Sequence, residues 1–151
     1  MTRTAAREIA ARLCYGLSEN PRDAGEVLDE FFDSEYYATL SQEAELYGDE
    51  PDERQREYIR RLVAGVAEHG AELDGYIEKY TVGWKFSRIS RTALAIIRIA
   101  MYEVLYMPDE VPPRAAINEA VELAKKYEEP ETVPFVNGVL GSFVKGEVTD
   151  A

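Results

Sequence analysis

A chain of 151 residues, of which 46% are hydrophobic, has the length and apolar content of one domain with a buried core. Its formal net charge of −12, from 29 acidic and 17 basic residues, opposes general attraction to a phosphate backbone. Any contact with nucleic acid must therefore use a local basic patch. No apolar stretch approaches the roughly 20 residues of a membrane helix and no signal peptide is evident, so we expect a soluble, cytoplasmic protein without a membrane partner.

Apolar residues recur at three- and four-residue steps through four segments of the first half, which predicts amphipathic helices. We expect these helices over residues 4–17, 21–32, 51–69 and 73–80. The first helix also carries a basic face, formed by Arg3, Arg7 and Arg12. Asn20 and Pro21 suit the N-cap and the first turn of the second helix. Between the second and third helices, residues 33–50 mix acids with tyrosines in no sustained helical register, and we interpret this segment as a long connection with room for a helical turn.

The second half predicts three more helices by the same spacing. They begin after Ser87 or Ser90, after Pro112, and at Pro134. The first of them has the longest apolar face and is the expected central helix. The pair Asn137-Gly138 is a hairpin signal on its own, but the flanking helical period is longer, so we expect the helix to continue. No segment alternates long enough to predict a strand, and the fold class is therefore all-α with about seven helices.

Residues that carry catalysis or bind metals are scarce. Cys14 and His69 are the only residues of their types, too few for a zinc site or for a carboxylate-bridged metal pair. Cys14 lies in an apolar run and is expected to be a buried thiol. Glu119 and Glu122 resemble solvated helix carboxylates more than a general acid-base pair. We therefore expect no enzyme, no catalytic residue, no metal and no cofactor.

The arginines of the first helix leave RNA binding open. Basic residues together with aromatic rings suit unpaired RNA, whose bases stack on such rings. Arginines on a helix surface are, however, more often ordinary solvated charge. The residues alone therefore allow both interpretations.

Five features of the second half occur in an order and spacing typical of one family. They are a helix with Ile97-Arg98, the pair Tyr102-Glu103, Pro112, the run INEAVELAK at 117–125 and the run FVNGVL at 135–140. This block resembles the most characteristic part of the NusB family. The opening AREIAARLCY is similar to the first helix of that family. The resemblance covers most of the chain, and residues 33–50 are its least family-like part.

The resemblance implies a NusB-like fold of two packed helical subdomains, over about 1–80 and 84–145 of a single domain, 1–151. It implies a transcription antitermination factor that binds boxA RNA of nascent ribosomal RNA transcripts together with NusE, a small-subunit ribosomal protein. Within such an antitermination complex, RNA polymerase reads through terminators. The alternative is a diverged NusB-like protein-interaction module without RNA binding. An enzyme is a third class, because NusB-like domains also occur fused to ribosomal RNA methyltransferases, and a homodimer is also left open.

Carried over position by position, the resemblance implies RNA contacts by four residues. Arg3 and Arg7 would neutralise phosphates or meet base edges, and Phe135 would present an aromatic surface to the RNA. Glu131 lies on the loop beside Phe135. The family's first helix usually holds a denser basic cluster, and Pro134 stands where a basic residue can occur, so we expect fewer ionic contacts and a shallower salt dependence.

Two further residues fall at family positions that face NusE. Tyr15 can both bury area and hydrogen-bond at such an interface, although a core tyrosine is the other interpretation. Ser90 replaces a family acid, which removes a charge partner for NusE.

Overall fold

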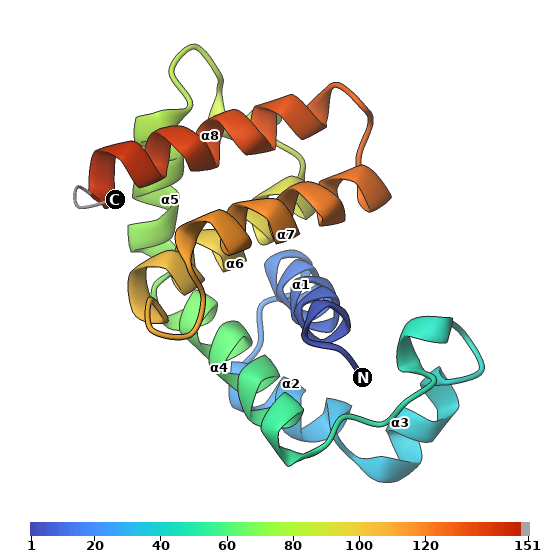
Figure 1. Ribbon diagram of the computed structural model, residues 1–151. Helices are drawn as coiled ribbons and strands as arrows, with labels where there is room; N and C mark the ends of the chain where they lie inside the picture. Colours follow the sequence, from blue (N-terminus) through green and yellow to red (C-terminus); the bar gives the residue numbers. More distant parts are fainter. Residues whose placement is uncertain (149–151) are drawn as a thin grey trace. The chain divides into compact units, whose positions relative to one another are not determined.

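The protein is all-helical in the computed structural model, which describes residues 1–148 (Figure 1). Over these residues there are eight α-helices and no strand. They are α1 (Arg3–Glu19), α2 (Ala24–Phe31), α3 (Ser34–Leu40), α4 (Glu53–Glu68), α5 (Gly70–Tyr80), α6 (Arg91–Tyr106), α7 (Pro113–Tyr127) and α8 (Thr132–Glu147), with short 3-10 helices η1 (Glu45–Tyr47) and η2 (Phe86–Arg88). The predicted fold class is confirmed, and α3 is the helix beyond the expected seven.

The chain divides into two compact units, Met1–Ala67 and the remainder from Glu68 onwards. Unit 1 contains α1 to α4, and unit 2 contains α5 to α8. The sequence placed residues up to about 80 with the first helices, whereas α5 groups with the C-terminal ones. The physical reason is that α5 packs against α6 and α8, and Arg98 of α6 forms an ion pair with Asp74 of α5 at 2.7 Å.

The join between α1 and α2 differs from the expected one. Asn20 is the C-cap of α1, and its N–H donates to the carbonyl of Gly16. Asp23 caps α2 instead, because its carboxylate accepts from the backbone N–H of Glu26 at 3.0 Å. The predicted start of this helix at Pro21 is therefore three residues too early.

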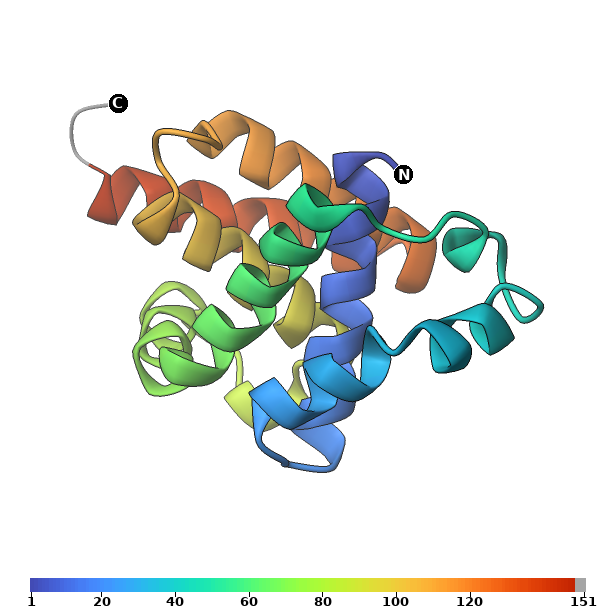
Figure 2. The same cartoon turned by 90° about the horizontal axis from the view of Figure 1, so that it is seen from below.

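Residues 33–50, the expected long connection with room for a helical turn, contain α3 and η1 and fold back on themselves. Asp33 caps α3 by accepting from the backbone N–H of Tyr36 at 3.0 Å. Tyr37 and Tyr47 are buried and pack edge to face, with ring centroids 6.0 Å apart. Both also contact the ring of Phe31, at 5.5 and 6.2 Å. In Figure 2, α3 and η1 lie next to each other beyond the end of α2.

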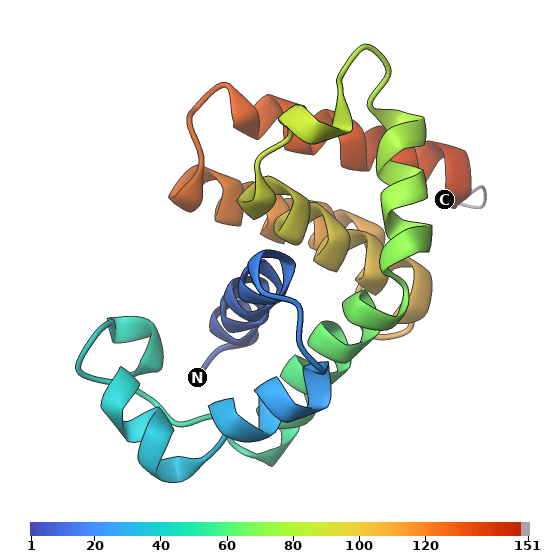
Figure 3. The same cartoon turned by 180° about the vertical axis from the view of Figure 1, so that it is seen from behind.

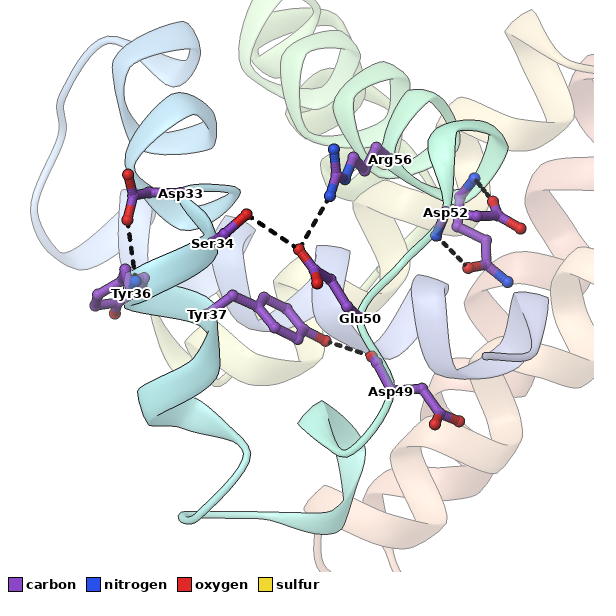
Figure 4. A network of polar contacts seen from close by, with 9 residues as sticks. Asp33, Ser34, Tyr36, Tyr37, Asp49, Glu50, Asp52 and Arg56 are labelled. Carbon is purple, nitrogen blue, oxygen red and sulfur yellow. Dashed lines mark hydrogen bonds and ion pairs between the residues drawn. The ribbon is translucent and has the colours of Figure 1, made fainter.

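Polar contacts close the same segment onto α4 (Figure 4). The hydroxyl of Tyr37 donates to the carbonyl of Asp49 at 3.0 Å. The carboxylate of Glu50 accepts from Ser34 at 3.4 Å and from Arg56 at 3.1 Å. These hydrogen bonds link α3 to the residues just before α4 and to α4 itself.

Helix α6 is the core of unit 2. It contacts α5, α7 and α8, and Ile96, Ile97 and Met101 are almost completely buried. Helices α7 and α8 run antiparallel beside each other (Figures 1 and 3). Asn137-Gly138 lies inside the continuous α8, as the helical period predicted.

The ends of α8 are shaped by a proline and a glycine. The helix begins at Thr132, so Pro134 sits in the first turn, where its missing N–H has no helical partner to lose. A Cβ at Gly146 would overlap the outer end of the Tyr80 side chain of α5, so a larger residue here would require Tyr80 to move. None of the helices over residues 1–148 combines the length and the apolar composition that crossing a membrane requires.

Candidate nucleic-acid interface

Arg3 and Arg7 meet at one aromatic ring within unit 1. They lie one turn apart on α1, and both guanidinium groups approach the ring of Tyr58 on α4. The Cζ atoms of Arg3 and Arg7 are 4.0 and 5.7 Å from the ring centroid. A cation over the face of an aromatic ring is attracted by its quadrupole. The structure therefore brings these two predicted residues together.

The two arginines differ in exposure, which corrects the expected basic face of α1. Arg3 is exposed, whereas Arg7 is only 5% exposed and the neighbouring Glu8 is also buried. Arg12 is exposed but turns to another partner, since it donates to the Tyr47 hydroxyl at 3.4 Å. The reason is that α1 is buried around most of its circumference, so it lacks the single solvent face of a simple amphipathic helix.

A hollow of about 290 Å³ adjoins Arg3 where α1 and α4 begin. It is lined by Arg3, Ala6, Asp52, Arg54, Gln55 and Tyr58. Asp52 and Gln55 form a capping box: the Asp52 carboxylate accepts from the Gln55 N–H at 2.9 Å, and the Gln55 side chain accepts from the Asp52 N–H at 2.8 Å. The hollow is thus lined by the guanidinium groups of Arg3 and Arg54 and by the Asp52 carboxylate, which caps α4.

Sequence reasoning missed Arg54. Its side chain is exposed and forms no hydrogen bond or ion pair with residues 1–148. It stands in the first turn of α4, far from Arg3 in the sequence, and no periodic pattern links the two. The signal that could have found it is an arginine in a helix start otherwise rich in acids. Arg3 and Arg54 outnumber Asp52, the one carboxylate among the residues that line this hollow.

In unit 2, Phe135 lies on α8 beside an aromatic ring that the sequence analysis did not select. The ring centroids of Phe135 and Trp84 are 4.7 Å apart, at an interplanar angle of 51°. Trp84 is 58% exposed. Glu131 is exposed at the N-cap position of α8, one turn before Phe135, and makes no capping hydrogen bond. Glu131 and Phe135 are therefore close on one helix, with Trp84 next to the latter.

The two residues predicted to face a protein partner occupy different settings. Tyr15 on α1 is 36% exposed, so the interpretation as a core tyrosine is wrong. Ser90 is the N-cap of α6 and accepts from the Ala93 N–H at 3.0 Å. Its hydroxyl also donates to the carboxylate of Glu128, at the end of α7. Ser90 therefore has a structural function, and its contact with a partner stays a prediction.

The remaining chemistry-bearing side chains are dispersed. Cys14 is buried, as its apolar surroundings predicted. In the part of the chain that the structure describes, no three histidine, cysteine, aspartate or glutamate side chains are grouped so that they could hold a metal ion. The surfaces that stand out are thus the arginine hollow of unit 1 and the aromatic pair of unit 2.

Comparison with known proteins gives a consistent family. The profile of the NusB family matches residues 4–145. The transcription antitermination protein NusB of Acetivibrio thermocellus is 43% identical over 151 residues, which are all of this chain and 94% of that protein. NusB of T. maritima superposes with a TM-score of 0.77 at 26% identity, over 96% of this chain and 92% of that one. A chain in a crystal structure described as a plectonemic RNA supercoil also gives a TM-score of 0.77, at 25% identity over 99% and 98%.

Proposed function

Because this chain belongs to the NusB family, we propose that it is a transcription antitermination factor that binds boxA RNA together with NusE. In this role it has no catalytic activity and acts in the cytoplasm on nascent ribosomal RNA transcripts. It would help RNA polymerase to read through terminators as part of an antitermination complex. The proposal is supported by relatives named for antitermination and by a structural neighbour found in a crystal structure described as an RNA supercoil.

The observation that carries the proposal is the arginine hollow of unit 1. The chain has a net charge of −12, yet Arg3 and Arg54 line one hollow. Phosphate contacts from arginines position RNA, and they supply the part of the affinity that depends on salt. The guanidinium group of Arg3 lies 4.0 Å from the centroid of the Tyr58 ring, a contact that would help to hold it in place for a phosphate. Arg7, which is buried, supports the same ring rather than meeting solvent.

Unit 2 would supply the contacts to bases. Phe135 offers a ring on which an unpaired base can stack, and the Glu131 carboxylate can accept hydrogen bonds from exocyclic amino groups. NusE would contact Tyr15, whose exposed ring can bury area and hydrogen-bond. With few cations on this chain, we expect modest RNA affinity in the absence of NusE.

The experiment is fluorescence anisotropy of labelled boxA RNA titrated with the protein across a salt series, beside a scrambled RNA. We expect selective binding whose salt slope falls by about 0.7 in the Arg3→Ala variant, because one phosphate contact to a single strand is lost. Arg22→Ala is the matched control, since Arg22 already forms an ion pair with Glu30 of α2 at 2.8 Å. Equal affinity for boxA and scrambled RNA would overturn the RNA-binding proposal and favour a protein-interaction module.

A further inference from the structure

A tight turn presents the only tryptophan of the chain to solvent. The backbone N–H of Trp84 donates to the carbonyl of Thr81 at 2.9 Å, and Gly83 has φ of +88°. A positive φ at the third position identifies a type II turn and favours glycine there. Thr81 is buried and its hydroxyl donates to the Ile77 carbonyl at 2.7 Å, which anchors the turn to α5. The position of Trp84 is thus set by the backbone.

Trp84 packs against one aromatic ring but stays largely exposed. One side of the indole contacts Phe135, and Figures 1 and 3 show the segment between α5 and α6 beside the N-terminal half of α8. This contact secures the segment on α8. It nevertheless leaves 58% of the side chain exposed, in an aromatic residue type that is usually well buried. The exposed Trp84 and the partly buried Phe135 together form an aromatic step.

The segment that carries Trp84 is also unusual in charge. No acidic residue occurs between Glu78 and Glu103, although the chain has 29 acids in 151 residues. The basic residues in this interval are Lys79, Lys85, Arg88, Arg91 and Arg98. Lys79 is paired with Glu147 and Arg98 with Asp74.

Lys85 and Arg88 are different, because both are exposed and neither forms an ion pair with any residue between 1 and 148. They follow Trp84 directly in the segment that leads to α6. Two exposed cations thus follow Trp84 in this segment with no acid between them in the sequence, although Glu131 lies one turn from Phe135 on α8. A polyanion with flat apolar faces matches this combination better than a protein surface does, since a protein partner would have to supply both acids and an apolar pocket.

We propose that Trp84 is a second base-stacking residue beside Phe135, and that Lys85 and Arg88 neutralise phosphates of the same single-stranded RNA segment. Exposed aromatic rings interleaved with cations are the general means by which proteins hold unpaired nucleic acid. The inference rests on the proposed function and adds to it an RNA contact on the segment between α5 and α6. Trp84 is the residue that sets base stacking there, and the two cations set the salt dependence.

The test uses the emission of the single tryptophan, which a stacked base quenches. Unlabelled boxA RNA is titrated into the protein, while labelled RNA reports the affinity independently by anisotropy. We expect Trp84 emission to fall along the binding curve, and Trp84→Ala to weaken affinity about tenfold. Trp84→Phe should retain most of the affinity. Lys85→Ala with Arg88→Ala should make the salt slope shallower by about 1.4, since each phosphate contact to a single strand contributes about 0.7.

Tyr36→Ala is the matched control, because Tyr36 is a 49% exposed aromatic residue on α3 in unit 1. It should leave RNA affinity unchanged, and thermal unfolding of each variant checks the fold. If boxA RNA binds selectively but neither quenches Trp84 nor distinguishes Trp84→Ala, the inference fails while the proposed function stands. If NusE alone quenches Trp84 and only NusE affinity depends on it, the surface is a protein contact and the inference is overturned. Absence of any selective RNA binding would overturn both.

Discussion

Arg3 and Arg7 have the same charge on the same helix, but their surroundings separate their effects. Arg3→Ala removes an exposed cation, so we expect weaker RNA binding and a change in stability within about 0.5 kcal/mol. Arg7→Ala removes a side chain that is only 5% exposed, and should lower the free energy of unfolding by about 1–3 kcal/mol. Urea unfolding measures both. Equal stability losses in the two variants would contradict the difference in burial.

A carboxylate near the end of α8 makes stability depend on pH. Hydrogen bonds from Lys79 and then Tyr80 lower the pKa of Glu147 below its ordinary value of 4.5. A carboxyl that is more acidic in the folded than in the unfolded protein stabilises the fold above that ordinary pKa, and this contribution is lost as pH falls through the lower, folded-state pKa.

We therefore expect Glu147→Gln to lower stability at neutral pH and to reduce the loss of stability on acidification. The measurement is the urea midpoint at neutral pH and again well below pH 4.5, the ordinary pKa of the group. Glu78→Gln is the control, as Glu78 is exposed on α5 next to Lys79. If the stability of the wild type and that of Glu147→Gln fall equally with pH, the hydrogen bonds of Glu147 with Lys79 and Tyr80 do not contribute in this way.

Among the helices, those with a long apolar period were predictable and the short one was not. The period of three and four residues extends through α6, α7 and α8, and their positions were confirmed to within a few residues. Helix α3 has seven residues, too few for a period to stand out. It depends on the Asp33 cap and on contacts with Phe31 and Tyr47, which lie on separate elements. Such tertiary contacts are not visible in a local pattern.

Substitution of Tyr37 tests the packing of α3 and η1, because Tyr37 is 3% exposed and contacts the rings of Phe31 and Tyr47. Tyr37→Ala should cost about 3 kcal/mol, since it leaves a cavity among aromatic side chains. Tyr37→Phe should cost about 1 kcal/mol through the lost hydrogen bond to Asp49. Hydrogen exchange should speed up over residues 33–50 in Tyr37→Ala. Protection there that stays at the wild-type level would refute the packing described for this segment.

For the whole molecule, the candidate site was only partly accessible from the sequence. Resemblance to a family selected Arg3, Arg7 and Phe135, but it could not show that Arg7 is buried. Arg54 and Trp84 were missed because each lies beside its neighbour only in the folded chain. Arg54 lines the same hollow as Arg3, where α1 and α4 begin, and Trp84 contacts Phe135 of α8. The acid-free interval around Trp84 was the one signal in the sequence that pointed to this region.

The net charge of −12 has a consequence for RNA selection. General repulsion of phosphates weakens nonspecific binding, so the positive charge that matters is confined to small patches. Under the proposed function, NusE would raise the RNA affinity of this protein by binding the same RNA. The free-energy coupling between the two ligands is reciprocal, so RNA should strengthen NusE binding by the same factor.

The measurement that tests this account most directly is the affinity of labelled boxA RNA for the protein with and without saturating NusE, beside a scrambled RNA. NusE should tighten boxA binding by at least about tenfold, a coupling of about 1.4 kcal/mol, and should tighten binding of the scrambled RNA much less. A folded protein that binds NusE while boxA and scrambled RNA remain equally weak would contradict the antitermination role and identify an RNA-free interaction module.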